Sequence, residues 1–181
     1  MRCPKELMIN PEISTELWIP SEYGEQECTN LTTIFWIDLV DKYYKKQFIE
    51  GWRMGYQTTL NPGPREAITN AICHGDFHRN GLGIGIFLSP EDVVWGVCDG
   101  GDYFKKSQVK EIWEEKKGTS TRGIQYDSGG DVTSGFNLGR ESMRYLDKVY
   151  IHQTTGTLYG KFNIENLLEK RSINIEKIRN Q

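Results

Sequence analysis

The residues EAITNAICHG, numbered 66–75, say more about the architecture of this chain than any other stretch. Glu66, Asn70 and His74 recur every four residues, so in a helix they would share one face. Pro64 favours a helix start just before them. The intervening residues would form a small, apolar flank suited to packing on a core: Ala67, Ile68, Ala71 and Ile72. We therefore expect a helix that is buried on one side and presents a polar stripe on the other.

The polar stripe has a specific chemistry. The amide oxygen of Asn70 is a suitable hard ligand for Mg²⁺, with phosphate oxygens and waters completing the octahedron. A carboxylate one turn earlier, at Glu66, can hold or deprotonate an attacking hydroxyl or water. Asn is also unfavourable in a helix interior unless its side chain has a role. These features indicate a nucleotide site, although an ordinary amphipathic helix with a solvated face would show the same residues.

The segment resembles the N box of the GHKL superfamily, the ATPases typified by gyrase, heat-shock chaperone, histidine kinase and mismatch-repair proteins. Its form is most similar to that of the anti-sigma factor serine/threonine kinases. The resemblance implies that Glu66 is the general base and that Asn70 binds Mg²⁺. It also implies that His74, followed by Gly75, closes the helix at the nucleotide. Cys73 stands where the family often has a Lys or Arg, so a phosphate contact from that position is missing.

The remaining patterns predict an α+β chain. Residues 16–19 suit an edge strand, and large apolar residues at helical spacing predict a core-facing helix over 31–48 that includes Leu31, Ile34, Val40 and Tyr44. Strand signals at 83–88 and 93–98, and again at 148–152 and 157–162, predict two hairpins, with a helix over 140–147 before the second. This order predicts a two-layer α/β sandwich, a mostly antiparallel sheet with helices on one face. It resembles the Bergerat-type ATP-binding fold of the GHKL proteins.

A second motif follows the first hairpin. Asp99 ends the strand signal and precedes Gly100 and Gly101, so its carboxylate can accept a hydrogen bond from the exocyclic amine of adenine while the backbone approaches a ligand closely. The segment resembles the G1 box, D-x-G-x-G, with Asp99 reading adenine, Gly101 as the first glycine and Tyr103 in place of the second. An aromatic ring at that position can stack on a base. Asp-Gly-Gly is also a good turn in its own right.

A third motif lies in GGDVTSGFNLG, residues 129–139, whose backbone N–H groups can meet phosphates ahead of a helix. It resembles the glycine-rich G2 box: Gly135 and Gly139 match the outer positions, and Asn137 replaces the middle glycine. A plain glycine-rich loop fits this segment about as well. Farther along, Thr157 follows a glycine as in the family's terminal Gly-Thr pair, which implies that its hydroxyl supports Asp99.

Composition narrows the class of protein. A chain of 181 residues with 37% hydrophobic content predicts one globular domain. The resemblance implies that this is a histidine kinase-like ATP-binding domain over 1–181. Its subdivisions would be an N-terminal arm (1–30), an ATP lid (103–134) and a C-terminal tail (163–181). The net charge of -3 is interspersed and gives no nucleic-acid footprint. Four cysteines without CxxC spacing indicate reduced thiols, and without a membrane span or signal we expect a cytoplasmic protein.

The expected function is Mg-dependent phosphoryl transfer from ATP, by a serine/threonine protein kinase of the anti-sigma regulatory type. The resemblance implies ATP and Mg²⁺ as ligands, a protein substrate or regulatory partner, and a homodimer. The net charge and the lack of a membrane span predict no nucleic-acid or membrane partner. Two alternatives stay open. The acceptor can be water, which makes the protein a stand-alone ATPase switch, or the domain can be a nucleotide- or partner-binding regulatory module with little catalysis. Tyr103 and Asn137, which replace family glycines, motivate the last alternative.

Overall fold

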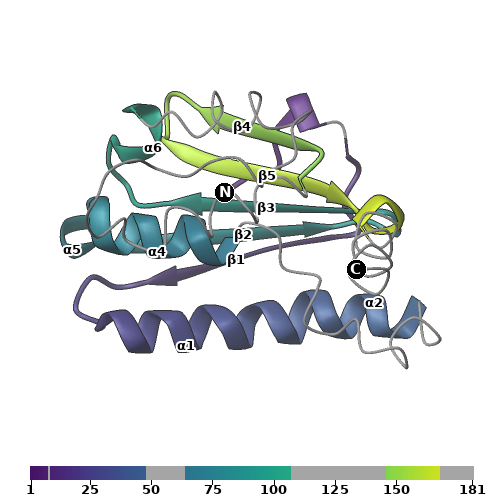
Figure 1. Cartoon of the computed structure of the whole chain (residues 1–181), viewed down its shortest axis with the longest axis horizontal. Helices are drawn as coiled ribbons and strands as arrows, with labels where there is room; N and C mark the ends of the chain where they lie inside the picture. The colour runs from purple at the N-terminus through teal and green to yellow at the C-terminus, as the bar shows by residue number, and fades with distance from the viewer. Residues whose placement is uncertain (8, 48–63, 107–145, 168–181) are drawn as a thin grey trace, which may run out of the picture.

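The computed structural model describes residues 1–7, 9–47, 64–106 and 146–167. The described chain is α+β and contains a five-stranded sheet in which every neighbouring pair is antiparallel, in the order β1-β2-β3-β5-β4 (Figure 1). The expected strand near residue 16 lies at one edge of this sheet, and both expected hairpins form. The strands are β1 (Ile13–Ile19), β2 (Leu82–Leu88), β3 (Asp92–Cys98), β4 (Lys148–His152) and β5 (Thr157–Asn163).

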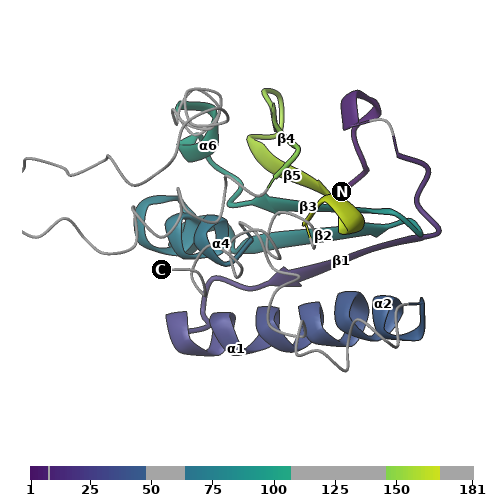
Figure 2. The same cartoon turned by 45° about the vertical axis from the view of Figure 1, so that its right-hand side comes forward.

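Helices cover one face of the sheet, as predicted. Helix α1 (Glu25–Trp36), a π-helical turn η2 (Ile37–Asp41) and α2 (Lys42–Gln47) continue into one another as a long rod beside β1, and α4 (Pro64–His74) lies against β2 and β3 (Figures 1 and 2). Short helices α5 (Phe77–Asn80) and α6 (Tyr103–Lys106) follow α4 and β3. The main core fills the space between this layer and the sheet. Every residue of β2 is buried because the sheet is covered on both faces.

The first long helix differs from its prediction in both start and orientation. It begins at Glu25 rather than near residue 31, because the Glu27 carboxylate accepts a hydrogen bond from the Gly24 backbone N–H at 2.6 Å and caps the first turn. Leu31 and Ile34, expected in the core, are 37% and 57% exposed. The buried side chains recur every four residues instead: Cys28, Thr32, Trp36, Val40 and Tyr44. Packing against α4 and the sheet selected one of two apolar stripes on this helix.

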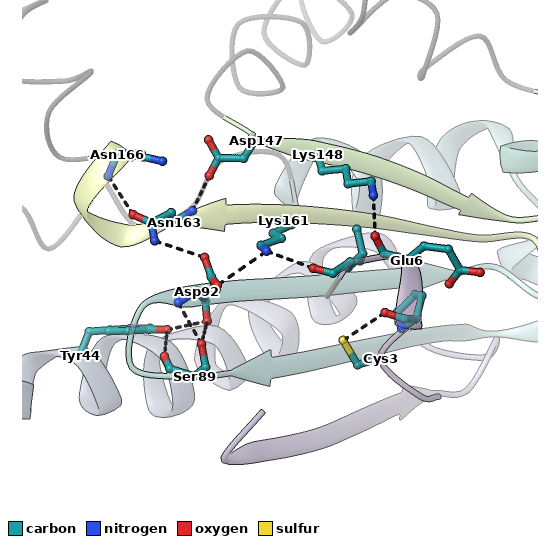
Figure 3. Close-up of polar contacts among 12 residues, drawn as sticks. Cys3, Glu6, Tyr44, Ser89, Asp92, Asp147, Lys148, Lys161, Asn163 and Asn166 are labelled. Carbon is teal, nitrogen blue, oxygen red and sulfur yellow. Dashed lines mark hydrogen bonds and ion pairs between the residues drawn. The ribbon is translucent and has the colours of Figure 1, made fainter. Parts of the chain in front are cut away.

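The N-terminal arm covers the opposite face of the sheet. Its 3₁₀ turn η1 (Lys5–Leu7) brings the buried Leu7 side chain into a second, smaller core with Phe87, Val94 and Tyr159. The Tyr159 hydroxyl donates to the Arg2 carbonyl at 3.1 Å. The ammonium groups of two lysines donate to the carbonyls of Glu6 and Leu7, as Figure 3 shows for Lys148 and Lys161. The arm is therefore an integral layer of the fold.

Parts of the predicted organisation lie outside the described residues. These are the lid beyond Lys106, the tail beyond Leu167, and the helix expected over 140–147 except for its last two residues, which are not helical. The four cysteines form no disulfide in the described chain, and Cys28 and Cys98 are buried. No helix in the described part of the chain has the length and apolar character needed to cross a membrane.

Candidate functional site

The candidate site begins with α4, which starts at Pro64 and ends at His74. The predicted apolar flank is confirmed, because its four members are buried: Ala67, Ile68, Ala71 and Ile72. The polar stripe turns away from that core, with Asn70 half-buried and His74 exposed. Glu66 lies on the same helix, and only its backbone is described. The helix therefore has the one-sided burial that a site-lining element requires.

Asp99, the first residue after β3, is the most unusual polar group near this helix. Its side chain has 0% exposure, and each carboxylate oxygen accepts one backbone hydrogen bond. Oδ2 accepts from the Asp76 N–H at 3.1 Å, and Oδ1 accepts from the Gly101 N–H at 3.0 Å. Within the described ranges no cationic side chain forms an ion pair with it. Because an ionised carboxylate can accept about four hydrogen bonds, Asp99 keeps acceptor capacity for a further donor.

Two glycines allow α4 and the end of β3 to meet. A Cβ on Gly75 would overlap Oδ2 of Asp99 and would lie 2.6 Å from the Ala71 carbonyl oxygen. A Cβ on Gly101 would overlap the Asp76 carboxylate. The backbone at both positions therefore approaches a carboxylate more closely than any residue with a side chain permits. The structure thus brings the His-Gly end of the first motif onto the Asp-Gly-Gly of the second.

Tyr103 completes this junction from α6. Its ring lies beside that of His74, with centroids 6.1 Å apart and planes tilted by 32°. The next residue, Phe104, has 0% exposure and anchors α6 in the core, where the helix lies against β4 and β5. Two aromatic rings therefore lie side by side at the C-terminal end of α4. One of them is Tyr103, whose ring we expected from the sequence to stack on a base.

A scan against known protein families finds no match to this chain. A search of curated proteins finds no relative either. The assignment of a function therefore rests on the chemistry of the α4–β3 junction and on the sequence motifs that it joins.

Thr157 is not brought to Asp99. It opens β5 and pairs with His152 of β4, and its hydroxyl lies 2.8 Å from that of Thr155. Its neighbour Leu158 packs in the core on the helix side, so Thr157 faces the other side of the sheet. There it lines a cavity together with Cys98, whereas the carboxylate of Asp99 faces α4. The described hydrogen bonds of Thr157 therefore belong to the opposite face.

The sequence reasoning missed Asp76, whose backbone N–H binds Asp99 and whose carboxylate lies against Gly101. Its only sequence signal is its place directly after the helix-ending Gly75. Gly135, Asn137 and Gly139 of the third motif lie outside the described residues.

Proposed function

We propose that this chain is a GHKL-type domain that binds Mg-ATP at the junction of α4 and β3 and transfers the terminal phosphoryl group to a serine or threonine of a partner protein. The observation that carries this proposal is the buried carboxylate of Asp99, held by two backbone N–H groups and without an ion pair in the described chain. Burial of an ionised carboxylate is costly unless donors compensate it. The exocyclic amine of adenine is a donor that suits its unused acceptor capacity.

The surrounding groups fit a nucleotide. The half-buried Asn70 and the exposed His74 face away from the core on α4, and the His74 and Tyr103 rings offer aromatic surface for a base. Asn70 would hold Mg²⁺ through its amide oxygen, and the ion when bound would neutralise phosphate charge. The backbone N–H groups near Gly135 and Gly139 are the proposed phosphate donors, and Glu66 is the proposed base for the acceptor hydroxyl.

The architecture supports the same proposal at a coarse level. A five-stranded antiparallel sheet carries α4 and α1 on one face, and the residues implied in adenine and metal binding lie on that face. We propose the Bergerat-type fold as the finer description. A protein substrate or regulatory partner and a homodimer belong to the same proposal, because they come with the anti-sigma kinase resemblance.

The first experiment is isothermal titration with a non-hydrolysable ATP analogue, with and without Mg²⁺. We expect Mg-dependent binding that Asp99→Asn weakens by about 1.5–3 kcal/mol, roughly the contribution of a hydrogen bond to a charged group. Asp92→Asn is the matched control, because Asp92 lies at the other end of β3 and contacts Lys161 instead. Equal affinities of the two variants for the analogue would show that Asp99 does not bind the nucleotide. Absence of binding at millimolar nucleotide would contradict the proposal as a whole.

One observation favours a second candidate, a nucleotide-binding regulatory module with little catalysis. Tyr103 replaces a glycine at the start of the expected lid, and the adjacent Phe104 is fully buried, so this end of the lid is anchored. Glu66→Ala separates the candidates. A kinase should lose turnover and keep nucleotide affinity, whereas a binding module should return ATP intact with or without the substitution. Phosphate release in the absence of any protein substrate would instead identify an ATPase switch.

A further inference from the structure

A cavity of about 510 Å³ opens on the face of the sheet opposite the helices. Its floor comes from the ends of three strands, through Trp18, Cys98 and Thr157, with Tyr159 and His152 beside them, and residues 1–6 of the arm form the remaining wall. The strand register explains this floor, because Trp18 pairs with Gly83, Gly83 with Cys98, and Thr157 with His152. Small-molecule sites in proteins typically enclose roughly 300–1,000 Å³, so the cavity has the size of a ligand site.

The indole of Trp18 gives the cavity an aromatic wall. A Cβ on Gly83 would lie 2.8 Å from a ring carbon of Trp18, so one face of the indole packs directly on the backbone of β2. The side chain is nevertheless 51% exposed. The outer part of the ring is therefore open, and a planar aromatic group can stack on it in an offset arrangement.

The turn between β4 and β5 supplies a polar wall. The backbone N–H of Thr155 donates to Nδ1 of His152 at 3.3 Å, and the Thr155 hydroxyl lies 3.0 Å from the same nitrogen and 2.8 Å from the Thr157 hydroxyl. When Nδ1 of a neutral imidazole accepts a hydrogen bond, the ring proton is on Nε2. Nε2–H of His152 can therefore donate to an anionic group, while the two threonine hydroxyls hold the imidazole in this orientation.

The arm adds positive charge. Arg2 and Lys5 are exposed residues that line the cavity, and among the described lining residues Glu6 is the one acidic residue. The nearby Glu16 carboxylate is neutralised by the N-terminal ammonium of Met1. An anion therefore gains from this wall, and Arg2 can bind a planar carboxylate with two parallel hydrogen bonds.

We propose that this cavity is a second ligand site, which takes a small planar aromatic acid. The aromatic ring stacks on Trp18, and the carboxylate lies between the arm cations and the His152–Thr155–Thr157 hydrogen-bond chain. The site is independent of the proposed nucleotide site, because Cys98 faces this cavity while the next residue, Asp99, faces α4.

The proposal is tested with three naphthalene probes of the same shape and different charge: 2-naphthoate, the neutral 2-naphthamide and the cationic 2-(aminomethyl)naphthalene. Nucleotide-free, ¹⁵N-labelled protein is titrated while the amide shifts of Trp18, Cys98, His152 and Thr157 are followed. We expect saturable binding of 2-naphthoate, roughly tenfold tighter than that of 2-naphthamide, and none of the cation. Equal affinity for the acid and the amide, or no saturation at a few millimolar, would overturn the proposal.

Two variants locate the site. Trp18→Ala should weaken 2-naphthoate binding at least about tenfold through loss of stacking, and Lys5→Glu should do so through charge without touching the core. Lys42→Glu is the matched control, because Lys42 is an exposed lysine on α2, on the other side of the sheet. Full affinity in Trp18→Ala, or equal weakening by the two lysine substitutions, would mean that the probe binds elsewhere or responds only to net charge.

Discussion

Single residues explain why α4 and β3 can meet at a buried carboxylate. Gly75 and Gly101 each place backbone where a Cβ would overlap a neighbouring carboxylate, and Asp99 takes its two hydrogen bonds from the backbone next to these glycines. A junction built in this way has no room for a methyl group.

We predict that Gly75→Ala destabilises the protein by about 1–3 kcal/mol, because the new Cβ meets Asp99 and the Ala71 carbonyl oxygen, neither of which can move freely. The free energy of unfolding in urea measures this effect. Arg79→Ala is the control, because Arg79 is an exposed residue of the neighbouring α5 and should change stability by less than about 0.5 kcal/mol. A stable Gly75→Ala protein would show that α4 can move away from Asp99.

A second residue-scale prediction concerns the buried thiol of Cys28. Burial raises its pKa from 9.0 to about 11. Between pH 9 and 11 the folded protein therefore keeps this proton, whereas the unfolded chain has lost it. The contribution of Cys28 to the free energy of unfolding is full below pH 9 and falls as the pH rises towards 11. The parent protein should therefore lose about 1 kcal/mol of stability between pH 8 and 10 through this thiol, and in reducing buffer Cys28→Ala should abolish that loss. Cys73→Ala, at an exposed cysteine, should leave that loss unchanged.

At the scale of elements, the π-helical turn η2 explains the burial pattern of the long helical rod. Its buried residues recur every four positions from Cys28 to Tyr44, and in a regular α-helix such a series drifts by about 40° per step. The wider turn at Ile37–Asp41 absorbs part of that drift. Tyr44 thereby reaches the core, where its hydroxyl lies 2.7 Å from the Ser89 carbonyl oxygen and 2.9 Å from that of Asp92 (Figure 3).

We predict that the rod tolerates loss of one residue in η2 and not in α1. Deletion of the exposed Asp38 should convert the turn to regular helix and keep Val40 and Tyr44 on the core side, at a cost of about 1 kcal/mol or less. Deletion of the exposed Asn30 should rotate the following helix by about 100° relative to Cys28 and cost several times more. The free energy of unfolding in urea measures both losses of stability, and equal losses would contradict the role assigned to η2.

At the scale of the whole molecule, the sheet lies between a helical layer and the N-terminal arm. The arm is held by Leu7 in the second core and by hydrogen bonds from Tyr159, Lys161 and Lys148. This cover buries the central strands on both faces and closes one wall of the cavity proposed as a second ligand site.

We predict that Leu7→Ala costs about 2–4 kcal/mol of stability, because its side chain is 1% exposed and its removal leaves a cavity among Phe87, Val94 and Tyr159. Leu31→Ala is the matched control, since that leucine is 37% exposed on α1 and its truncation should cost less than about 1 kcal/mol. Both values come from equilibrium unfolding. A Leu7→Ala cost as small as that of Leu31→Ala would show that the arm is detached in solution.

Local patterns were sufficient for α4, for the edge strand and for both hairpins. The start of α4 at Pro64, its buried flank around Ala67 and Ala71, and both hairpins follow from helical periodicity, proline and β-branched runs, which act over a few residues. The residues proposed for the site also come from local patterns, and their roles stay predictions. Asn70, His74, Asp99, Gly101 and Tyr103 belong to two short motifs, and the structure brings the ends of those motifs together.

Only the assembled tertiary structure sets which side of the sheet or helix each side chain points to. The strand register pairs Val97 with Leu158, so Thr157 points to the arm side of the sheet, although its motif suggested a contact with Asp99. A register shift of one residue would have placed Thr157 on the helix side. The exposure of Leu31, the cover formed by Leu7 and the hydrogen bond from Asp76 to Asp99 have the same origin. Each depends on contacts between residues distant in the chain, whereas a helix or hairpin signal depends only on neighbours in the sequence.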